Sequence, residues 1–300
     1  MKTAVVVGAS GVVGTALVEG LAGRWNVRAI SRGGHAPALE GVQGVAADAR
    51  DTAAMRRACE GADVLYHLVH SLGQPGFARL DHDVAISVRQ AATGAGVSQI
   101  VYLGGLGDEG ADLSEHLRSR LETGRVLAQG PVPVTVLRAA VVIGRGSAAF
   151  ETIVALVDRL PGMICPRWVS TPTQPIALAD VTRYLVGVAG RSEALGRSFD
   201  VGGPEVMTYR DMLERIARLR GRRPIIVEVP VLTPRLSSLW IRLVTPVGAS
   251  VARPLVEGLR VPTVASEHTI GDLVPFERTP FDAAARDALA PLRRELRVPG

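Results

Sequence analysis

The residues with the clearest chemical potential form a glycine turn near the N-terminus. Gly8, Gly11 and Gly14 follow an apolar, β-branched run at 3–7 and precede an amphipathic helical pattern that extends to about residue 21. Glycines in such a strand–turn–helix unit let the backbone approach a pyrophosphate, which then meets free N–H groups at the helix N-terminus. We therefore predict a dinucleotide site; the alternative is a turn that only packs the helix on the strand. The expected contacts are Gly8, Ser10, Gly11, Val12 and Val13.

The same turn predicts the effect of substitution. A side chain on Gly8 or Gly11 would block the approach of the backbone to the pyrophosphate. We expect variants at either position to lose dinucleotide binding, and the fold to survive for the most part if this blockage is the main effect.

The end of the second predicted strand, at 26–31, indicates which dinucleotide binds. NAD sites commonly place an Asp or Glu about 20 residues beyond the glycines, where it binds the ribose hydroxyls. Here the strand ends in Ser31 and Arg32, without an acid. The Arg32 guanidinium can pair with a 2′-phosphate and Ser31 can add a hydrogen bond, so we predict NADP(H). The alternative is that Arg32 is only a solvated loop charge.

His116 and Arg120 are the candidates for the chemical step. They are four residues apart in a helical pattern over 113–129, so they share one helix face. His116 titrates near neutral pH and can donate a proton, whereas Arg120 stays protonated and cannot act as an acid or base. A neighbouring guanidinium lowers the pKa of the imidazole. The alternative for His116 is a structural or cofactor-positioning role.

Other chemistry is poorly supported. His67 and His70 are three apart at the end of a predicted strand and should point to opposite faces, so no metal site is predicted. Cys59 and Cys165 have no partner pattern, and we expect two buried, reduced thiols. No G-x-S-x-G motif is present, which argues against a covalent hydrolase.

The elements that must position these residues are strands alternating with helices. This alternation predicts an α/β fold, a Rossmann-type doubly wound parallel sheet with right-handed crossovers. Near-continuous apolar strands are typical of a sheet that is covered on both faces. The six predicted strands are 3–7, 26–31, 42–46, 64–68, 99–103 and 134–138.

After residue 141 the pattern changes to short helices, short strands and proline-rich segments. We expect 1–145 to form an NADP-binding core, to which 174–201 returns. Segments 146–173 and 202–300 are expected to form a smaller C-terminal cap that binds the substrate. The cleft between core and cap would lie at the carboxyl ends of the strands.

Composition narrows the class of protein. The apolar fraction of 47% and charged fraction of 21% are ordinary for a globular protein. The net charge of +5 is spread over arginines interspersed with acids, and aromatics make up only 4%, so nucleic-acid binding is not expected. No long apolar stretch or export signal is evident. We expect a cytoplasmic protein with a small-molecule substrate and no integral membrane segment.

The order of motifs GASGVVG, ISRG, AADARD, DVLYHLV, IVYLGGLG, VTVLRAAVVIG and QPIALADV resembles the extended and atypical short-chain dehydrogenase/reductases over about residues 1–220. HLRSRLETG and TPFDAA are similar to an NAD(P)H-binding subgroup related to nitrogen-metabolite-repression regulators and sugar-nucleotide epimerases. The resemblance implies that Asp48 contacts the adenine amino group. It also implies that Leu68, Val69 and His70 run along the ribose and pyrophosphate, and we include Ala140 among the cofactor contacts.

The chain departs from that family in its proton chemistry. Typical members place a Ser at the end of the fifth strand and a Tyr-x-x-x-Lys on the next helix, where the Lys lowers the tyrosine pKa. Here the serine position reads Gly104-Gly105, and His116 and Arg120 replace the Tyr and Lys. Lys2 is the only lysine, so the four tyrosines are expected to stay protonated at neutral pH. Arg120 would hold the ribose hydroxyls, as the family lysine does.

Two functional classes follow. The first is an NADPH-dependent reductase of an apolar or conjugated small molecule, whose acceptor is already activated, as in a conjugated C=C, a quinone or an iminium. Water or His116 would supply the proton. The second is a non-redox NADP-binding protein, either a cofactor sensor or regulator or an isomerase or cyclase that uses the same pocket.

Overall fold

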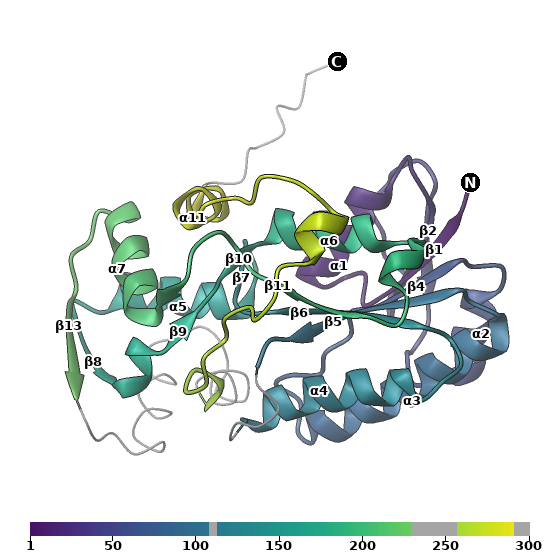
Figure 1. Ribbon diagram of the computed structural model, residues 1–300, viewed down its shortest axis with the longest axis horizontal. Coiled ribbons are helices and arrows are strands. Elements are labelled where there is room, and N and C mark those ends of the chain that lie inside the picture. Colours follow the sequence, from purple (N-terminus) through teal and green to yellow (C-terminus); the bar gives the residue numbers. More distant parts are fainter. Residues whose placement is uncertain (108–112, 230–256, 291–300) are drawn as a thin grey trace.

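A seven-stranded parallel sheet forms the centre of the computed structural model, which describes residues 1–107, 113–229 and 257–290 (Figure 1). Its order is β11-β6-β5-β4-β1-β2-β3, so the chain starts in the middle, runs to one edge and then crosses to the other side of β1. Ligands bind at the carboxyl ends of the strands beside such a switch point. The strands are β1 (Thr3–Val7), β2 (Asn26–Ser31), β3 (Val42–Ala46), β4 (Val64–His67), β5 (Gln99–Gly105), β6 (Val134–Ala139) and β11 (Ser198–Val201).

Helices cover both faces of the sheet because alternate strand residues point to opposite sides. Ala4 and Val6 of β1 pack with α1 and α6, whereas Val5 and Val7 pack with α2, α3 and α4. Figure 1 shows α3 and α4 on one side of the strands and α1 and α6 on the other. The predicted doubly wound sheet is confirmed. The helices are α1 (Val12–Leu21), α2 (Thr52–Cys59), α3 (Phe77–Ala95), α4 (Glu115–Ala128) and α6 (Leu178–Val188).

The seventh strand, β11, lies beyond the six strands that the alternation predicts. It pairs in parallel with β6, and this places Asp200 beside Arg138, with 2.6 Å between a carboxylate oxygen and a guanidinium nitrogen. Asp200 is almost fully buried. A buried carboxylate in a four-residue strand interrupts the apolar run, and Arg138 on the neighbouring strand supplies a charge that compensates it.

A third apolar cluster lies beyond one end of the sheet and joins α5 (Ala148–Arg159), α7 (Tyr209–Leu219) and α11 (Phe281–Leu289). Helix α7 begins with a capping box between Thr208 and Asp211. Two parts of the predicted cap, residues 230–256 and 291–300, lie outside the described residues. The remaining elements are β7 (Val142–Ile143), β8 (Gly162–Pro166), η1 (Arg167–Ser170), β9 (Pro172–Thr173), β10 (Ile176–Ala177), η2 (Ser192–Ala194), β12 (Met207–Thr208), β13 (Ile225–Val229) and α10 (Ile270–Leu273).

Two whole-chain expectations can be compared with the described residues. None of the described helices is both long and apolar enough to cross a membrane. Cys59 and Cys165 are both buried and unpaired, as expected. Burial raises the pKa of the Cys59 thiol to about 12 and that of Cys165 to about 11, so neither is a ready nucleophile.

Candidate functional site

The glycine turn joins β1 to α1, and the space available for a side chain differs among its three glycines. Gly8 has a φ of +92°, and a Cβ there would lie 3.0 Å from backbone atoms of Leu68 and Val69. A Cβ on Gly14 would lie 2.2 Å from the carbonyl oxygen of Gly8. A Cβ on Gly11 would have its nearest neighbour at 3.4 Å, an ordinary contact. A side chain on Gly8 would strain the turn itself, so blocked approach to the pyrophosphate is not the sole effect expected at that position.

The N-terminus of α1 is open towards a ligand. Gly11 is its N-cap residue and supplies no side-chain hydrogen bond, so the first-turn N–H groups have no capping partner. Gly8, Gly11, Val12 and Val13 line a cavity there, while Ser10 is exposed on the turn. Free N–H groups and the positive end of the helix dipole fit the pyrophosphate of a dinucleotide.

An arginine-rich edge lies where β2 and β3 end side by side. Ala47 N–H donates to the carbonyl oxygen of Ser31 at 3.1 Å, and the buried Ser31 hydroxyl has no hydrogen-bond partner. Hydrogen bonds from Arg50 lower the pKa of Asp48 to about 2, and the charge of Arg32 adds to that effect. The Asp48 carboxylate is thus already engaged, with Arg50 Nη2 at 2.6 Å. Arg50 is a second cation at this edge that the sequence analysis missed, although it lies in the AADARD motif.

The cavity has a volume of about 460 Å³ and extends from the glycine turn to the third apolar cluster. At its far end it is lined mainly by apolar and aromatic side chains, among them Ile153, Leu156, Trp168, Tyr209 and Leu213. The sequence analysis named neither Trp168 nor Tyr209 as a site residue. The predicted residues that line the cavity are Gly8, Gly11, Val12, Val13, Leu68, His70, His116, Arg120 and Ala140.

The other predicted cofactor residues do not line this cavity. Val69 packs in the apolar cluster on the α2–α4 side of the sheet. Ser31, Arg32 and Asp48 lie at the β2–β3 edge, where the adenosine end of an extended dinucleotide would be held. The predicted contacts therefore lie in two main places, the cavity that includes the glycine turn and the edge where β2 and β3 end.

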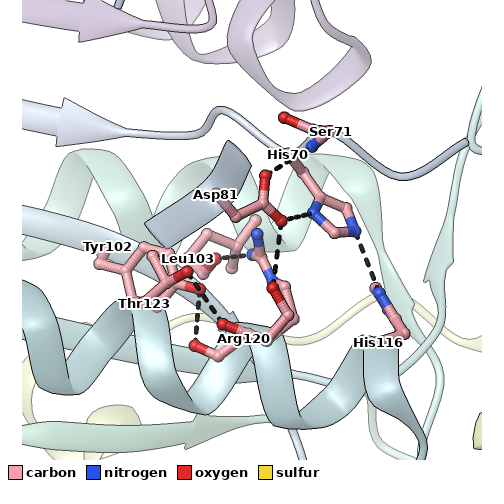
Figure 2. Close-up of polar contacts among 9 residues, drawn as sticks. His70, Ser71, Asp81, Tyr102, Leu103, His116, Arg120 and Thr123 are labelled. Atoms are coloured by element: carbon pink, nitrogen blue, oxygen red, sulfur yellow. Dashed lines mark hydrogen bonds and ion pairs between the residues drawn. The ribbon is translucent and has the colours of Figure 1, made fainter. Parts of the chain in front are cut away.

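A hydrogen-bonded chain of three side chains reaches the cavity between the glycine turn and the apolar end (Figure 2). His70 follows β4, Asp81 lies on α3, and His116 lies in the first turn of α4. His70 Nδ1 lies 2.7 Å from Asp81 Oδ2, and His70 Nε2 lies 3.0 Å from His116 Nδ1. Asp81 was not a predicted site residue, since no local pattern links it to His116.

The pKa values of both imidazoles are lowered. Burial is the largest cause for His116, followed by His70 and Arg120, and together they bring its pKa to about 3. Burial also lowers the pKa of His70, although Asp81 opposes that effect. The predicted direction for His116 is correct, but the Arg120 charge is not the main cause.

Arg120 is held against the end of β5. Its guanidinium donates to the carbonyl oxygen of Leu103 and lies 5.1 Å from the centre of the Tyr102 ring. The Tyr102 hydroxyl in turn donates to the Arg120 carbonyl oxygen at 2.8 Å. These contacts hold the first half of α4 beside the end of β5. Arg120 and His116 both line the cavity there.

None of the tyrosines is prepared to exchange a proton at neutral pH. Burial raises the pKa of Tyr66, Tyr102, Tyr184 and Tyr209, and no lysine offsets it. The expectation that they stay protonated agrees with this direction. Tyr209 is the one among them that lines the cavity.

Fold and site together define an α/β protein with a dinucleotide site at the switch point of its sheet. Residues 8–140 match a family model described as NAD(P)H-binding. A protein of Streptomyces griseus subsp. griseus, named (4-alkanoyl-5-oxo-2,5-dihydrofuran-3-yl)methyl phosphate reductase, is 26% identical over 220 residues, which are 72% of this chain and 73% of that protein.

Solved structures share the fold across nearly the whole chain. A nucleoside-diphosphate-sugar epimerase from Staphylococcus aureus matches with a TM-score of 0.75 and 15% identity, covering 95% of this chain and 99% of that one. The Citrobacter sp. triphenylmethane reductase complexed with NADP(H) matches with a TM-score of 0.73 and 17% identity, covering 96% and 100%. These structures show the fold of the chain, and the family model marks residues 8–140 as its NAD(P)H-binding part.

Proposed function

We propose that the protein is an NADPH-dependent reductase of apolar, conjugated small molecules. The observation that carries this proposal is one cavity that connects the glycine turn, the His116–Arg120 helix face and an apolar chamber. NADPH, when bound, would supply a hydride. The chain would supply the binding surfaces and hold a proton at His116.

The residues present fit a phosphorylated dinucleotide. The uncapped N-terminus of α1, with Gly8 and Gly11, would bind the pyrophosphate. Arg32 would pair with the 2′-phosphate, and the unpartnered Ser31 hydroxyl would add a hydrogen bond. Arg50 would strengthen the positive edge. The lack of an acid at the end of β2 supports NADP(H) over NAD.

The chamber suggests the class of acceptor. Ile153, Leu156 and Leu213 offer apolar contacts, and Trp168 and Tyr209 offer faces on which a planar conjugated system can stack. The names of two similar proteins support a conjugated acceptor. One is named for a dihydrofuranone that bears an alkanoyl group, in which carbonyl groups adjoin a ring double bond, and the other for triphenylmethane. Segments 146–173 and 202–300 would serve as the substrate cap.

The missing tyrosine–lysine pair limits the reaction. No described tyrosine has a lowered pKa. The acceptor must therefore take up hydride without activation by a hydrogen bond from an acidic tyrosine. A conjugated C=C, a quinone or an iminium meets this condition. His116 would then protonate the reduced product, and Arg120 would hold the ribose end of the site.

Matched acceptor pairs test the proposal. NADPH absorbance is followed with a conjugated lactone and its saturated counterpart, a quinone and its hydroquinone, and a cationic dye and its reduced form. We expect NADPH consumption with at least one conjugated member and none with its reduced partner. Tight NADPH binding by calorimetry without acceptor-dependent consumption in any pair would favour the non-redox alternative, a cofactor sensor or an isomerase or cyclase.

A further inference from the structure

The three residues Asp81, His70 and His116 form a continuous path from a buried carboxylate to the cavity. Asp81 is only 3% exposed. Its Oδ2 lies 2.7 Å from His70 Nδ1, and His70 Nε2 lies 3.0 Å from His116 Nδ1 (Figure 2). Because Nδ1 of His116 is engaged, its Nε2 is the atom left for a ligand in the cavity that His116 lines.

The surroundings of Asp81 determine how hydrogens are arranged along this path. Its carboxylate accepts from Ser71 N–H at 2.7 Å and from the Ser119 hydroxyl at 3.3 Å, which favours the ionised form. His70 must then carry its hydrogen on Nδ1 and present a lone pair at Nε2. His116 consequently carries its hydrogen on Nδ1, and its Nε2 is free to accept a proton.

One added proton exchanges donor and acceptor in the hydrogen bond between His70 Nε2 and His116 Nδ1. His70 becomes an imidazolium that donates to Asp81 from Nδ1 and to His116 from Nε2. His116 then accepts at Nδ1 and carries its hydrogen on Nε2, which faces the cavity. This loaded form pairs one cation with one carboxylate, so the added proton brings the net charge of the three side chains from −1 to zero.

We propose that Asp81, His70 and His116 form a proton relay for the reduction, an inference that rests on the proposed function. The acceptor takes a hydride, with its electron pair, from NADPH and becomes an anion, or a neutral amine from an iminium. An anionic product forms a bond to the proton on His116 Nε2 as that N–H bond breaks. The proton on His70 Nε2 passes to His116 Nδ1, and a solvent proton later reloads the pair. His116 is the catalytic residue, and His70 and Asp81 are positioning residues that act through it.

Neighbouring charges tune the relay. Arg120 of α4 lies beside the pair and favours the neutral imidazoles, whereas Asp81 of α3 favours the charged form. His67 at the end of β4 is fully buried without hydrogen-bond partners and stacks on Tyr102 of β5, so it stays neutral. Burial is the largest influence on both imidazoles, and the opposing charges of Arg120 and Asp81 add to it and oppose it, respectively.

Nitrogen NMR of the unliganded, full-length protein tests the hydrogen arrangement without turnover. Of the six histidines in the chain, we expect His70 and His116 to be protonated on Nδ1 at neutral pH, the less common tautomer of a free imidazole. Asp81→Asn should convert His70 to the Nε2–H tautomer, because an amide N–H would then face its Nδ1. His82→Gln, next to Asp81 and outside the path, is the control and should change neither signal. Nε2–H tautomers on both residues of the unsubstituted protein would overturn the relay, even if Asp81→Asn fails to fold.

Kinetics of His70→Gln distinguish a relay from a cofactor contact. We expect a loss of at least roughly tenfold in kcat with unchanged NADPH affinity and an altered pH profile, since a general acid contributes roughly 10²–10⁴-fold. Weaker NADPH binding with an unchanged kcat would assign His70 to the cofactor and overturn the relay. If the unsubstituted protein turns over no acceptor, the proposed function is wrong. The NMR measurement then still tests the hydrogen arrangement.

Discussion

Gly14 packs directly against Gly8: a Cβ on Gly14 would lie 2.2 Å from the Gly8 carbonyl oxygen. This contact closes the turn between β1 and α1 and leaves no room for a side chain. Gly11, between them, is not constrained in this way, because its nearest neighbour to an added Cβ is at 3.4 Å. Gly14 is therefore needed for the turn to fold, whereas the fold itself does not require a glycine at position 11.

The pair Gly11→Val and Gly14→Val uses this difference. We expect Gly11→Val to fold with near-normal thermal stability but to lose NADPH binding in calorimetry, because the side chain would occupy the pyrophosphate position. Gly14→Val should lower the melting temperature or prevent folding, because backbone must move. Normal NADPH affinity in folded Gly11→Val would contradict the dinucleotide assignment.

Cofactor preference depends on the β2–β3 edge. We expect the unsubstituted protein to bind NADPH more tightly than NADH, and Arg32→Asp to narrow or reverse that difference. A charge-assisted hydrogen bond contributes about 1.5–3 kcal/mol, which corresponds to roughly 10–150-fold in affinity. Arg24→Asp, an exposed charge change away from this edge, is the matched control. Equal affinities for the two cofactors in the unsubstituted protein would remove the preference.

His116 and Tyr209 both line the cavity, and their roles are expected to differ. His116→Ala should reduce turnover by roughly 10²–10⁴-fold with NADPH affinity unchanged, as for loss of a general acid. Tyr209→Phe should have a small effect on kcat, because burial raises the pKa of that phenol. Complete loss of turnover in Tyr209→Phe, with NADPH still bound, would mean that tyrosine is the proton donor after all.

The pH profile has a definite sign. The donor acts only when loaded with a proton, so kcat/KM for reduction should fall as pH rises. Burial lowers the pKa of His70 from 6.5 and that of His116 to about 3, so the fall should be centred on the acid side of pH 6.5. Rates are measured after subtraction of non-enzymatic NADPH decay, with His116→Ala as the flat reference. A profile that rises with pH would indicate a base instead.

The edge strand β11 should depend on its buried ion pair. Asp200 accepts from Ser266 N–H at 2.8 Å and pairs with Arg138, which is itself largely buried. Asp200→Ala would remove the buried carboxylate that pairs with that guanidinium and should lower the free energy of unfolding by about 3–5 kcal/mol. Urea denaturation measures the change. Asp158→Ala, which removes a more exposed ion pair with Arg220, should cost about 1 kcal/mol or less.

Local pattern was enough to predict the nucleotide-binding half of the molecule. The glycine spacing and the alternation of strands with helices are encoded by neighbouring residues, since backbone conformation and burial period are properties of short segments. The shared face of His116 and Arg120 follows from helix geometry in the same way. The first two features predicted the fold class and the cofactor class, and a tyrosine–lysine pair was excluded because Lys2 is the only lysine.

The reaction site depends on which distant segments pack together. His70 follows β4, Asp81 belongs to α3 and His116 to α4, and only the packing of α3 on α4 beside the strand ends brings them into hydrogen-bond contact. The same holds for Tyr209 and Trp168, which line the cavity from beyond the sheet. The periodicity of apolar residues within short segments does not predict such contacts, because they depend on how helices and strands pack across the whole sheet. The sequence by itself therefore determined the dinucleotide-binding fold. The tertiary structure decided that Asp81 is hydrogen-bonded to His70, and His70 to His116.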